Sequence, residues 1–580
     1  MVKFSAETIK APFESKEAFL RFVRTDSPGG VVSTPWSNKD LEPTPPEHRH
    51  WRWFNLPFYW MTTAFGTAGW NLAASLIATG LTWRQSFAAC ALGVLISGIA
   101  VVLAARCAAV YHIGYPVIAR SIFGLYGSFF FVFFRATIGT IWYGINTFYG
   151  ANLMSTCLLC MFGHKWKNFP NHLPESASIT SAQLLCFFLV WFIQAPFTLI
   201  HPRNAHWVFV VKGSVMPVAI FGLFGWCMAN GAGISAIGNP LAKQADTPLG
   251  WAMLSGINSV IGISAGLLVS QPDMARYSVN PRAAGIPQGF FLAIPKLLVL
   301  FLGLASTASM QGKWGTAYWN IWDLNNAILE HNWTAAARTA VFLESLCFFF
   351  STVGTNIGAN LIPFSADVAG LLPRYITIVR GQVLCALIAV VILPWKLVAS
   401  AQAFLTFLGA YNIFMGPILG LMAADYFIVR KGNIHIPSLY QPIKGTLYMF
   451  YHGFNLRSHL AWTGGMLLGL PGLIAAYQPN AVGESAKRMY TMAWILTTAM
   501  TVFLYLVLCY IFPVQTYPTA YSDVPVKWEY LGATEGYFDG EERRPTVFDE
   551  LHGLPMQEEN IEKEAITIDM EKIVGSKTEV

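Results

Sequence analysis

Trp142 and Asn146 are the two residues in this sequence best suited to hold a flat ring. They lie four residues apart inside one apolar stretch, so on a helix they share a face. An indole offers a flat surface for stacking, and a carboxamide offers hydrogen-bond donors and an acceptor. Tryptophan in membranes also collects at the interface with water, but Trp142 lies near the middle of its stretch. The pair therefore favours a planar heterocycle with amide edges as ligand.

Another apolar stretch, residues 348–370, contains a dense run of hydroxyl and amide side chains. The run comprises Ser351, Thr352, Thr355, Asn356 and Asn360. A buried amide without a partner is costly in hydrocarbon, so these side chains must face a cavity, an ion or another helix. Asn356 and Asn360 share a helix face. A ligand site and hydrogen bonding between helices are the two interpretations.

Acidic and basic residues stand together at the ends of three apolar stretches. The pairs are Asp273 with Arg276, Asp367 with Arg374, and Asp425 with Arg430. They predict salt bridges that form or break as a gate closes, and end-charges that reach toward water are the alternative. Glu344 is a candidate buried carboxyl able to carry a proton. We expect no other Asp, Glu, Lys or His near the middle of the first ten stretches.

The elements that must position these side chains are membrane helices. The chain has 580 residues, of which 54% are hydrophobic and 12% charged, and its mean hydropathy is +0.46. A soluble domain carries about 25% charged residues, so this is a polytopic, all-α membrane protein. Twelve apolar spans are predicted, at about 55–80, 85–112, 126–162, 181–200, 205–231, 251–271, 288–311, 338–364, 376–396, 401–429, 459–477 and 490–513.

Motifs and charge argue against an enzyme, a primary pump and a nucleic-acid-binding protein. The net charge of +6 is modest and spread between loops. The sequence has no nucleotide-binding glycine loop, no HExxH motif and no credible nucleophile–base pair. Its nine cysteines are scattered, without the spacing of a disulfide framework. We therefore expect no metal site, no cofactor and no nucleic acid partner.

The first span carries small and polar residues at its centre. These are Thr62, Thr63, Gly66, Thr67, Gly69, Trp70 and Asn71. Each glycine costs a helix about 1 kcal/mol relative to alanine, so this span is predicted to unwind and free backbone groups for a ligand. Small-residue packing against a neighbouring helix is the alternative. The sixth span is predicted to break likewise, at Gly256, Gly262 and Gly266 around Ser264. Breaks in spans one and six indicate two five-helix repeats of inverted topology, followed by two extra helices.

The order of spans and charged loops predicts the overall organisation. The expected parts are an N-terminal tail at 1–52, a ten-helix core at 53–433 with repeats at about 53–232 and 250–430, helices 11 and 12 at 434–513, and a C-terminal tail at 514–580. An even number of spans puts both tails on one side. The excess of Lys and Arg in the loops of that side places them in the cytoplasm. Residues 521–580 are expected to be solvated tail, and 556–573 is a candidate partner-binding helix.

Six motifs carry a family resemblance. They are NKDLEPTPPEHRHW before the first span, GLTWRQ after it, RATIGTIWYG in the third, QPDMARY ending the sixth, TNIGANLIPFSADVAGLLPRYI in the eighth and PILGLMAADYFIVRKG in the tenth. Together they resemble the nucleobase–cation symporter family 1, above all its fungal Fur-type branch of uracil, allantoin, uridine, thiamine and nicotinamide riboside permeases. The resemblance runs from about Asn38 to Asn433. It implies the five-plus-five inverted-repeat (LeuT-like) fold, alternating access and ion-coupled uptake.

The resemblance also assigns substrate-binding residues by position. The family's stacking tryptophan falls on Trp142, its neighbouring amide on Asn146, the helix 1 amide on Asn71, the helix 8 asparagine on Asn360 and the centre of helix 6 near Ser264. Two of these positions are Gln in relatives and Asn here. The shorter arms keep the amide chemistry and lose reach, which favours a bulkier or differently shaped ring than uracil.

The coupling ion is inferred from the same resemblance. Bacterial relatives hold sodium with helix 1 carbonyls and two adjacent helix 8 hydroxyls, and those hydroxyls map to Gly354 and Thr355, so one is missing here. The cation site or its remnant is expected at Thr67, Trp70, Ser351 and Thr355, and the cytoplasmic gate candidates are Asp273, Arg276, Asp367 and Asp425. The lost oxygen disfavours sodium and favours a proton.

These observations predict a plasma-membrane transporter that imports a nucleobase-like nitrogenous heterocycle, such as uracil, allantoin or uridine, together with protons. An importer of thiamine or nicotinamide riboside is the alternative within transport. A transport-inactive nutrient receptor, or a channel, is the alternative outside it. The expected partners are the small-molecule substrate, membrane lipid, and trafficking or ubiquitin machinery on the tails.

Overall fold

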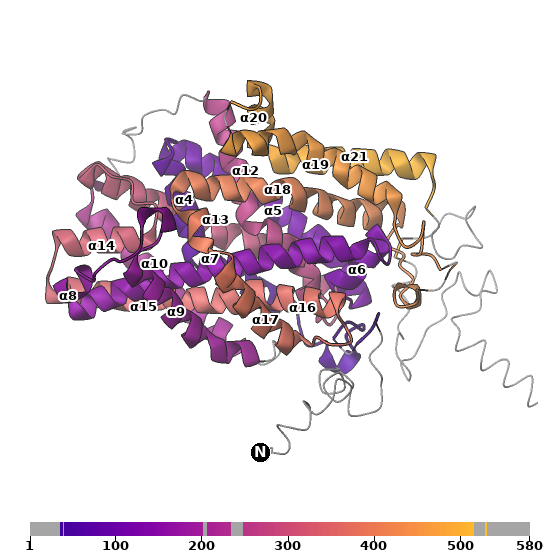
Figure 1. The fold of residues 1–580 in the computed structure, drawn as a ribbon, viewed down its shortest axis with the longest axis horizontal. Helices are drawn as coiled ribbons and strands as arrows, with labels where there is room; N and C mark the ends of the chain where they lie inside the picture. Colours follow the sequence, from indigo (N-terminus) through magenta and orange to yellow (C-terminus); the bar gives the residue numbers. More distant parts are fainter. Residues whose placement is uncertain are drawn as a thin grey trace, which may run out of the picture.

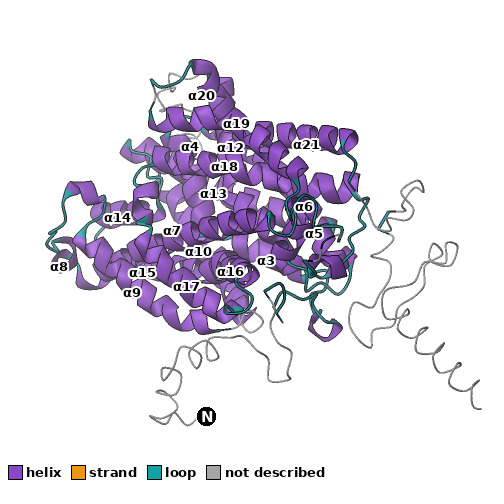
Figure 2. Cartoon of the chain, turned by 45° about the vertical axis from the view of Figure 1, so that its right-hand side comes forward, coloured by secondary structure: helices purple, strands orange, loops and turns teal. Residues whose placement is uncertain are grey.

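The computed structural model of the chain describes residues 35–38, 40–200, 206–233, 248–442, 444, 446–478, 480–514 and 528–529. Most of the two predicted tails, including the candidate helix at 556–573, lies outside the described residues. The described part is built from helices, and Figure 2 draws no strand in it. The predicted all-α class is thereby confirmed.

The long helices lie side by side across the view of Figure 1. In chain order the α-helices are α3 (Asn55–Ala64), α4 (Thr67–Ala78), α5 (Trp83–Tyr111), α6 (Tyr115–Phe123), α7 (Ser128–Phe162), α8 (His164–Lys167), α9 (Ser181–Gln194), α10 (His206–Asn230), α12 (Leu249–Ala275), α13 (Ile286–Trp314), α14 (Ile321–His331), α15 (Ala335–Thr355), α16 (Ile362–Leu371), α17 (Ile378–Val391), α18 (Ala401–Ala423), α19 (Leu456–Tyr477), α20 (Glu484–Thr491) and α21 (Ala493–Ile511). Two π-helices, η7 (Asn356–Leu361) and η9 (Ala424–Val429), continue α15 and α18. Short 3₁₀ turns occupy Pro46–His48, Glu175–Ala177, Ala195–Leu199, Pro281–Ala284, Pro394–Val398 and Pro437–Leu439.

Within the described residues, 10 helical segments are long and apolar enough to cross a membrane. They correspond to ten of the twelve predicted spans. The other two predictions fall on the pair α3 and α4, which together form the first span, and on α17, which is shorter.

Polar caps set several of the helix starts. The Thr82 hydroxyl accepts from the Gln85 amide, while the Gln85 side chain accepts from the Thr82 amide, and this capping box begins α5.

The first span is interrupted, as its glycines and hydroxyls predict. Helix α3 ends at Ala64, and α4 begins at Thr67 after an extended Gly66, with φ −161° and ψ 167°. The interruption frees the carbonyl of Phe65, which accepts a hydrogen bond from Ser351 Oγ at 3.2 Å. The break in the first span is confirmed.

The sixth span is continuous, so the predicted break at Gly256, Gly262 and Gly266 is wrong. Helix α12 runs unbroken from Leu249 to Ala275. A Cβ at Gly262 would lie 2.9 Å from the Leu408 carbonyl oxygen, and one at Gly256 would lie 3.3 Å from the Ala89 Cβ. These two glycines allow α12 to pack closely on α18 and α5, and that packing outweighs their low helix propensity.

The eighth span contains an irregularity instead. Between α15 and α16 the chain forms the π-helix η7, Asn356–Leu361, in the middle of the polar run. Single π turns inside α-helices are frequent at functional sites. The irregular backbone therefore lies in spans one and eight, which face each other where Ser351 contacts Phe65.

Both terminal segments pack on the same end of the bundle, which we call the tail end. Arg276 donates to the carbonyl oxygens of Asp40, at 2.9 Å, and Glu42, at 2.5 Å. Arg106 binds Glu529, with Nε 2.7 Å from Oε1. At the opposite end, on the left of Figure 1, lie α8 and α14, and we call this the loop end. An even number of spans predicts that both tails lie on the same side of the membrane, which agrees with these contacts. The cytoplasmic location of that side stays a prediction.

Candidate ligand-binding cavity

A cavity lies where the broken first span meets α7, α12, α13 and the eighth span. The charged, polar and aromatic side chains of its lining include Arg135, Trp142, Asn146, Lys296, Thr355 and Asn360. Three predicted substrate-binding residues, Trp142, Asn146 and Asn360, are therefore brought to one cavity from helices more than 200 positions apart.

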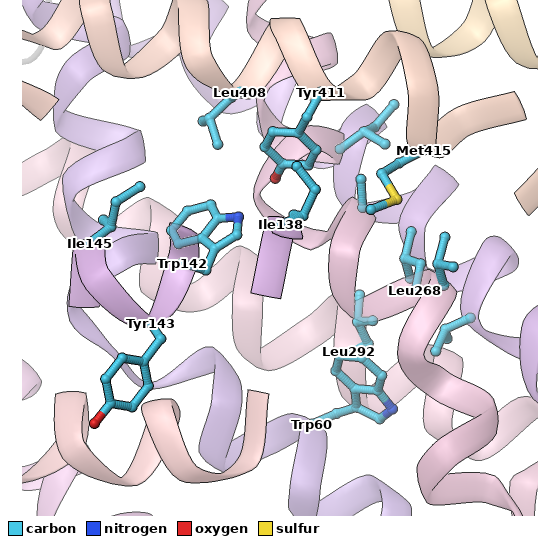
Figure 3. Packing of buried hydrophobic residues seen from close by; sticks show 14 of the residues in the cluster. Trp60, Ile138, Trp142, Tyr143, Ile145, Leu268, Leu292, Leu408, Tyr411 and Met415 are labelled. Atoms are coloured by element: carbon cyan, nitrogen blue, oxygen red, sulfur yellow. The ribbon is translucent and has the colours of Figure 1, made fainter. Parts of the chain in front are cut away.

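Trp142 belongs to the cavity wall. Its side chain is 8% exposed, and its ring centroid lies 5.7 Å from that of Phe407 on α18, at an interplanar angle of 59°. Figure 3 shows the indole extending from α7 toward Tyr411, whereas the neighbouring Tyr143 extends in another direction. The indole thus lies inside the bundle against Phe407, and it lines the cavity.

Asn146 and Asn360 present amide groups from two sides. Asn146 Nδ2 donates to the backbone carbonyl of Trp142 at 3.1 Å, which holds the amide against its own helix. Asn360 Nδ2 donates to Asn356 Oδ1 at 2.8 Å, and Asn356 Nδ2 donates in turn to Gln194 Oε1, also at 2.8 Å. Asn356 therefore links helices, as one interpretation of the polar run expects, while Asn360 lines the cavity and its contact with a ligand stays a prediction.

Asn71 and Ser264 do not line the cavity. Asn71 is fully buried, donates to Asn320 Oδ1 at 3.3 Å and accepts from the Ile321 amide at 3.2 Å, so it anchors the start of α14. Ser264 is buried, and its hydroxyl is bonded by Lys296 Nζ. Ser264 therefore contributes to the cavity wall through Lys296. Substrate contacts by Asn71 and Ser264 stay predictions that this geometry does not favour.

The hydroxyl groups of the expected cation-site remnant are each hydrogen-bonded to other protein groups. Thr67 Oγ1 lies 3.2 Å from Thr352 Oγ1, and Ser351 Oγ donates to Phe65 O. Lys212 Nζ, from α10, donates to Thr355 Oγ1 at 2.7 Å. Trp70 is fully buried, with its backbone against Gly303 of α13. An ammonium group thus sits beside the hydroxyl that was expected to face a bound cation.

The expectation of no Lys in the middle of these spans is wrong. Lys212 lies within α10 and is 2% exposed, and Lys296 lies within α13 at the cavity wall. Arg135 lies within α7 and is equally buried. Each of these three is the one charged residue of its predicted apolar span. A search for single charges inside the predicted spans would therefore have found them.

Two of the three acidic gate candidates converge on an arginine that the sequence analysis did not single out. Arg135 Nη1 lies 2.7 Å from Asp273 Oδ2, and Arg135 Nη2 lies 2.5 Å from Asp367 Oδ1. These contacts connect α7, α12 and α16 at the tail end. Arg276 binds the N-terminal segment instead of forming the expected pair with Asp273. Among the described residues, the expected partner Arg374 forms no ion pair with Asp367.

The third acidic candidate forms its expected pair. Arg430 Nε lies 2.8 Å from Asp425 Oδ2, and the Tyr505 hydroxyl donates to Asp425 Oδ1 at 2.7 Å. This cluster connects the end of the tenth span to α21. The proton-carrier candidate Glu344 is half-buried near the loop end, where it accepts from Asn325 of α14 and from Ser345.

A bundle of membrane-length helices around an internal cavity beside an interrupted helix is the architecture of a membrane transporter. A family model described as "Permease for cytosine/purines, uracil, thiamine, allantoin" matches residues 43–497. The chain belongs to this permease family. It is 32% identical over 526 residues to the allantoin permease of Saccharomyces cerevisiae, covering 88% of this chain and 82% of the relative. It is also 32% identical over 491 residues to the uracil permease of the same yeast, covering 83% and 77%.

A solved structure shows the same fold. The structure of Mhp1, a nucleobase–cation-symport-1 family transporter, in a closed conformation with bromovinylhydantoin bound, superposes with a TM-score of 0.65. The match is 19% identical and covers 84% of this chain and 98% of the Mhp1 chain. The predicted LeuT-like architecture is thereby confirmed, and the named relatives are permeases rather than enzymes.

Proposed function

We propose that the protein is a proton-coupled symporter that imports a nucleobase-like nitrogenous heterocycle by alternating access. The observation that carries the proposal is the meeting of Trp142, Asn146 and Asn360 in one cavity. The indole face stacks the ring, and the two carboxamides bond its edges. Relatives named as allantoin and uracil permeases, and a neighbour with a bound hydantoin, support this substrate class.

Proton coupling is supported by Lys212. Its ammonium donates to Thr355 Oγ1, next to the interrupted first span, in the place assigned to a coupling cation. A buried amine that gains and loses a proton changes the charge at this position, as an arriving and departing sodium ion would. Sodium needs several oxygen ligands, and the lysine occupies one of the hydroxyls expected to supply them. We therefore favour a proton as the coupling ion.

A second candidate substrate class is a vitamin or its riboside. The nicotinamide riboside transporter 1 of Saccharomyces cerevisiae is 27% identical to this chain over 501 residues. The shortened amide arms at 71 and 146 accord with a ligand larger than uracil, although Asn71 lies away from the cavity. We place the protein in the plasma membrane, where an importer acts, and we place its tails in the cytoplasm because basic residues are enriched in the loops on that side.

The test is uptake of labelled heterocycles into cells that lack their own permeases. Purines, pyrimidines, hydantoins, thiamine and nicotinamide riboside compete against one labelled ligand. Saturable accumulation driven by an inward proton gradient, and indifferent to sodium, is expected. Binding without accumulation would instead indicate a receptor, and non-saturable flux would indicate a channel.

Lys212→Met tests the coupling site. The variant is expected to lose accumulation against a gradient while it still binds the ligand, because the ring site is intact and the titrating amine is gone. Lys165→Met removes an exposed lysine and is expected to behave as wild type. Full proton-driven accumulation by Lys212→Met would refute the role of this lysine.

A further inference from the structure

Lys296 places a cationic side chain in the wall of the cavity. It lies in the middle of α13, between lipid-facing neighbours such as Ile294 and Leu298. Its ammonium donates to the hydroxyl of Ser264 on α12, and the residue lines the same cavity as Trp142. The half-buried side chain therefore directs its ammonium group toward α12 and the cavity.

The charge of Lys296 lacks a counter-ion in the described part of the protein. None of the residues that line the cavity is acidic, and none of the ion pairs between described residues includes Lys296. Arg135, the other cation of the wall, is matched by both Asp273 and Asp367. An ammonium has three donors, and one of those of Lys296 is taken by Ser264.

A cationic side chain inside a membrane span costs free energy unless a counter-ion or an anionic ligand compensates its charge. Charged groups inside membrane spans are rare and usually line substrate or ion pathways. In a site shielded from water, an anionic acceptor both neutralises the charge and takes up its free donors. The structural alternative is that Ser264 alone retains the lysine as a packing residue, but one neutral hydroxyl supplies no charge.

We propose that Lys296 recognises a negatively charged group of the substrate, so that the transported ligand is an anionic heterocycle. The ring stacks on Trp142, and its carboxylate or ionised ring imide binds Lys296 Nζ, while Ser264 holds the ammonium in place. The proposal rests on the proposed function of the cavity and narrows its substrate class. It predicts that, for one ring system, the anion binds more tightly than the neutral form.

The experiment compares matched ligand pairs on the purified full-length protein. Uracil is paired with uracil 6-carboxylate, and hypoxanthine with urate, which is ionised at neutral pH, so the pairs separate a ring carboxylate from an ionised imide. A hydrogen bond to a charged group corresponds to roughly 10- to 100-fold in affinity. At least one anion is therefore expected to bind roughly tenfold or more tightly than its neutral partner. In Lys296→Met the ratio should fall to about one, with neutral binding retained, and Lys296→Arg should keep it.

The outcomes distinguish the two proposals. Neutral ligands that bind as well as or better than both anions in wild type would overturn the role of Lys296 and leave the proposed function standing. An equal loss of neutral and anionic binding in Lys296→Met, with normal thermal unfolding, would also overturn it. No binding of any heterocycle in the panel would instead contradict the proposed function itself.

Discussion

Arg135→Leu is expected to destabilise the protein strongly, because it removes the one cation between two buried carboxylates. Its guanidinium lies 2.7 Å from Asp273 and 2.5 Å from Asp367, and all three side chains are at most 3% exposed. Breaking a buried ion pair by removing one partner costs about 3–5 kcal/mol, since an uncompensated charge stays behind. Here two facing carboxylates stay behind, so we expect a loss at the upper end of that range.

The assay is thermal unfolding of the purified protein in detergent, with transport measured in parallel. If the cost arises from stranded charge, neutralising both acids should recover most of it. The triple variant Arg135→Leu, Asp273→Asn, Asp367→Asn is therefore expected to melt well above Arg135→Leu alone. Arg84→Leu, which removes an exposed arginine, serves as the control. A single variant that unfolds like wild type, or a triple variant as unstable as the single one, would refute this account of the ion pairs.

Two further substitutions test packing and titration. A Cβ at position 262 would lie 2.9 Å from the Leu408 carbonyl oxygen, so Gly262→Ala should lower the free energy of unfolding by about 1–3 kcal/mol. Gly225→Ala, with nothing within 4 Å, should not lower it, and equal melting temperatures would contradict the close contact. Burial and the charge of Arg49 lower the pKa of His112 from 6.5 to about 4. The unfolded chain then binds a proton that the folded protein does not, so stability falls as pH drops from about 6.5 toward 4. His112→Gln should reduce that slope in a melting-temperature series, and an unchanged slope would contradict the shift.

Spacing and polarity in the sequence predicted the elements that build the cavity. The pair Trp142 and Asn146 shares a face because an α-helix brings residues four apart together, and Asn360 reaches the cavity because a membrane helix cannot leave an amide facing lipid. The interruption of the first span followed from Gly66 and its polar neighbours. These features depend on local chemistry, which a single segment already contains.

Features that depend on a partner element escaped prediction. The continuity of α12 could not be foreseen, because Gly262 is stabilised by the close approach of Leu408, more than a hundred positions away. Asn71 is bound by Asn320 and Ile321 for a similar reason, since only the folded chain brings α14 against the first span. Lys296 was overlooked within an apolar run, although its charge is visible in the sequence.

The most direct test of the central claim, that Trp142 stacks a planar heterocycle inside the cavity, is the dissociation constant of the best-competing ligand from the uptake panel. Stacking on an aromatic side chain is worth about 1–3 kcal/mol per base, or roughly five- to 150-fold in affinity. Trp142→Ala should weaken binding within that range, Trp142→Phe should retain most of it, and Trp53→Ala, at a side chain 62% exposed, should change nothing. Wild-type affinity in correctly folded Trp142→Ala would contradict the claim.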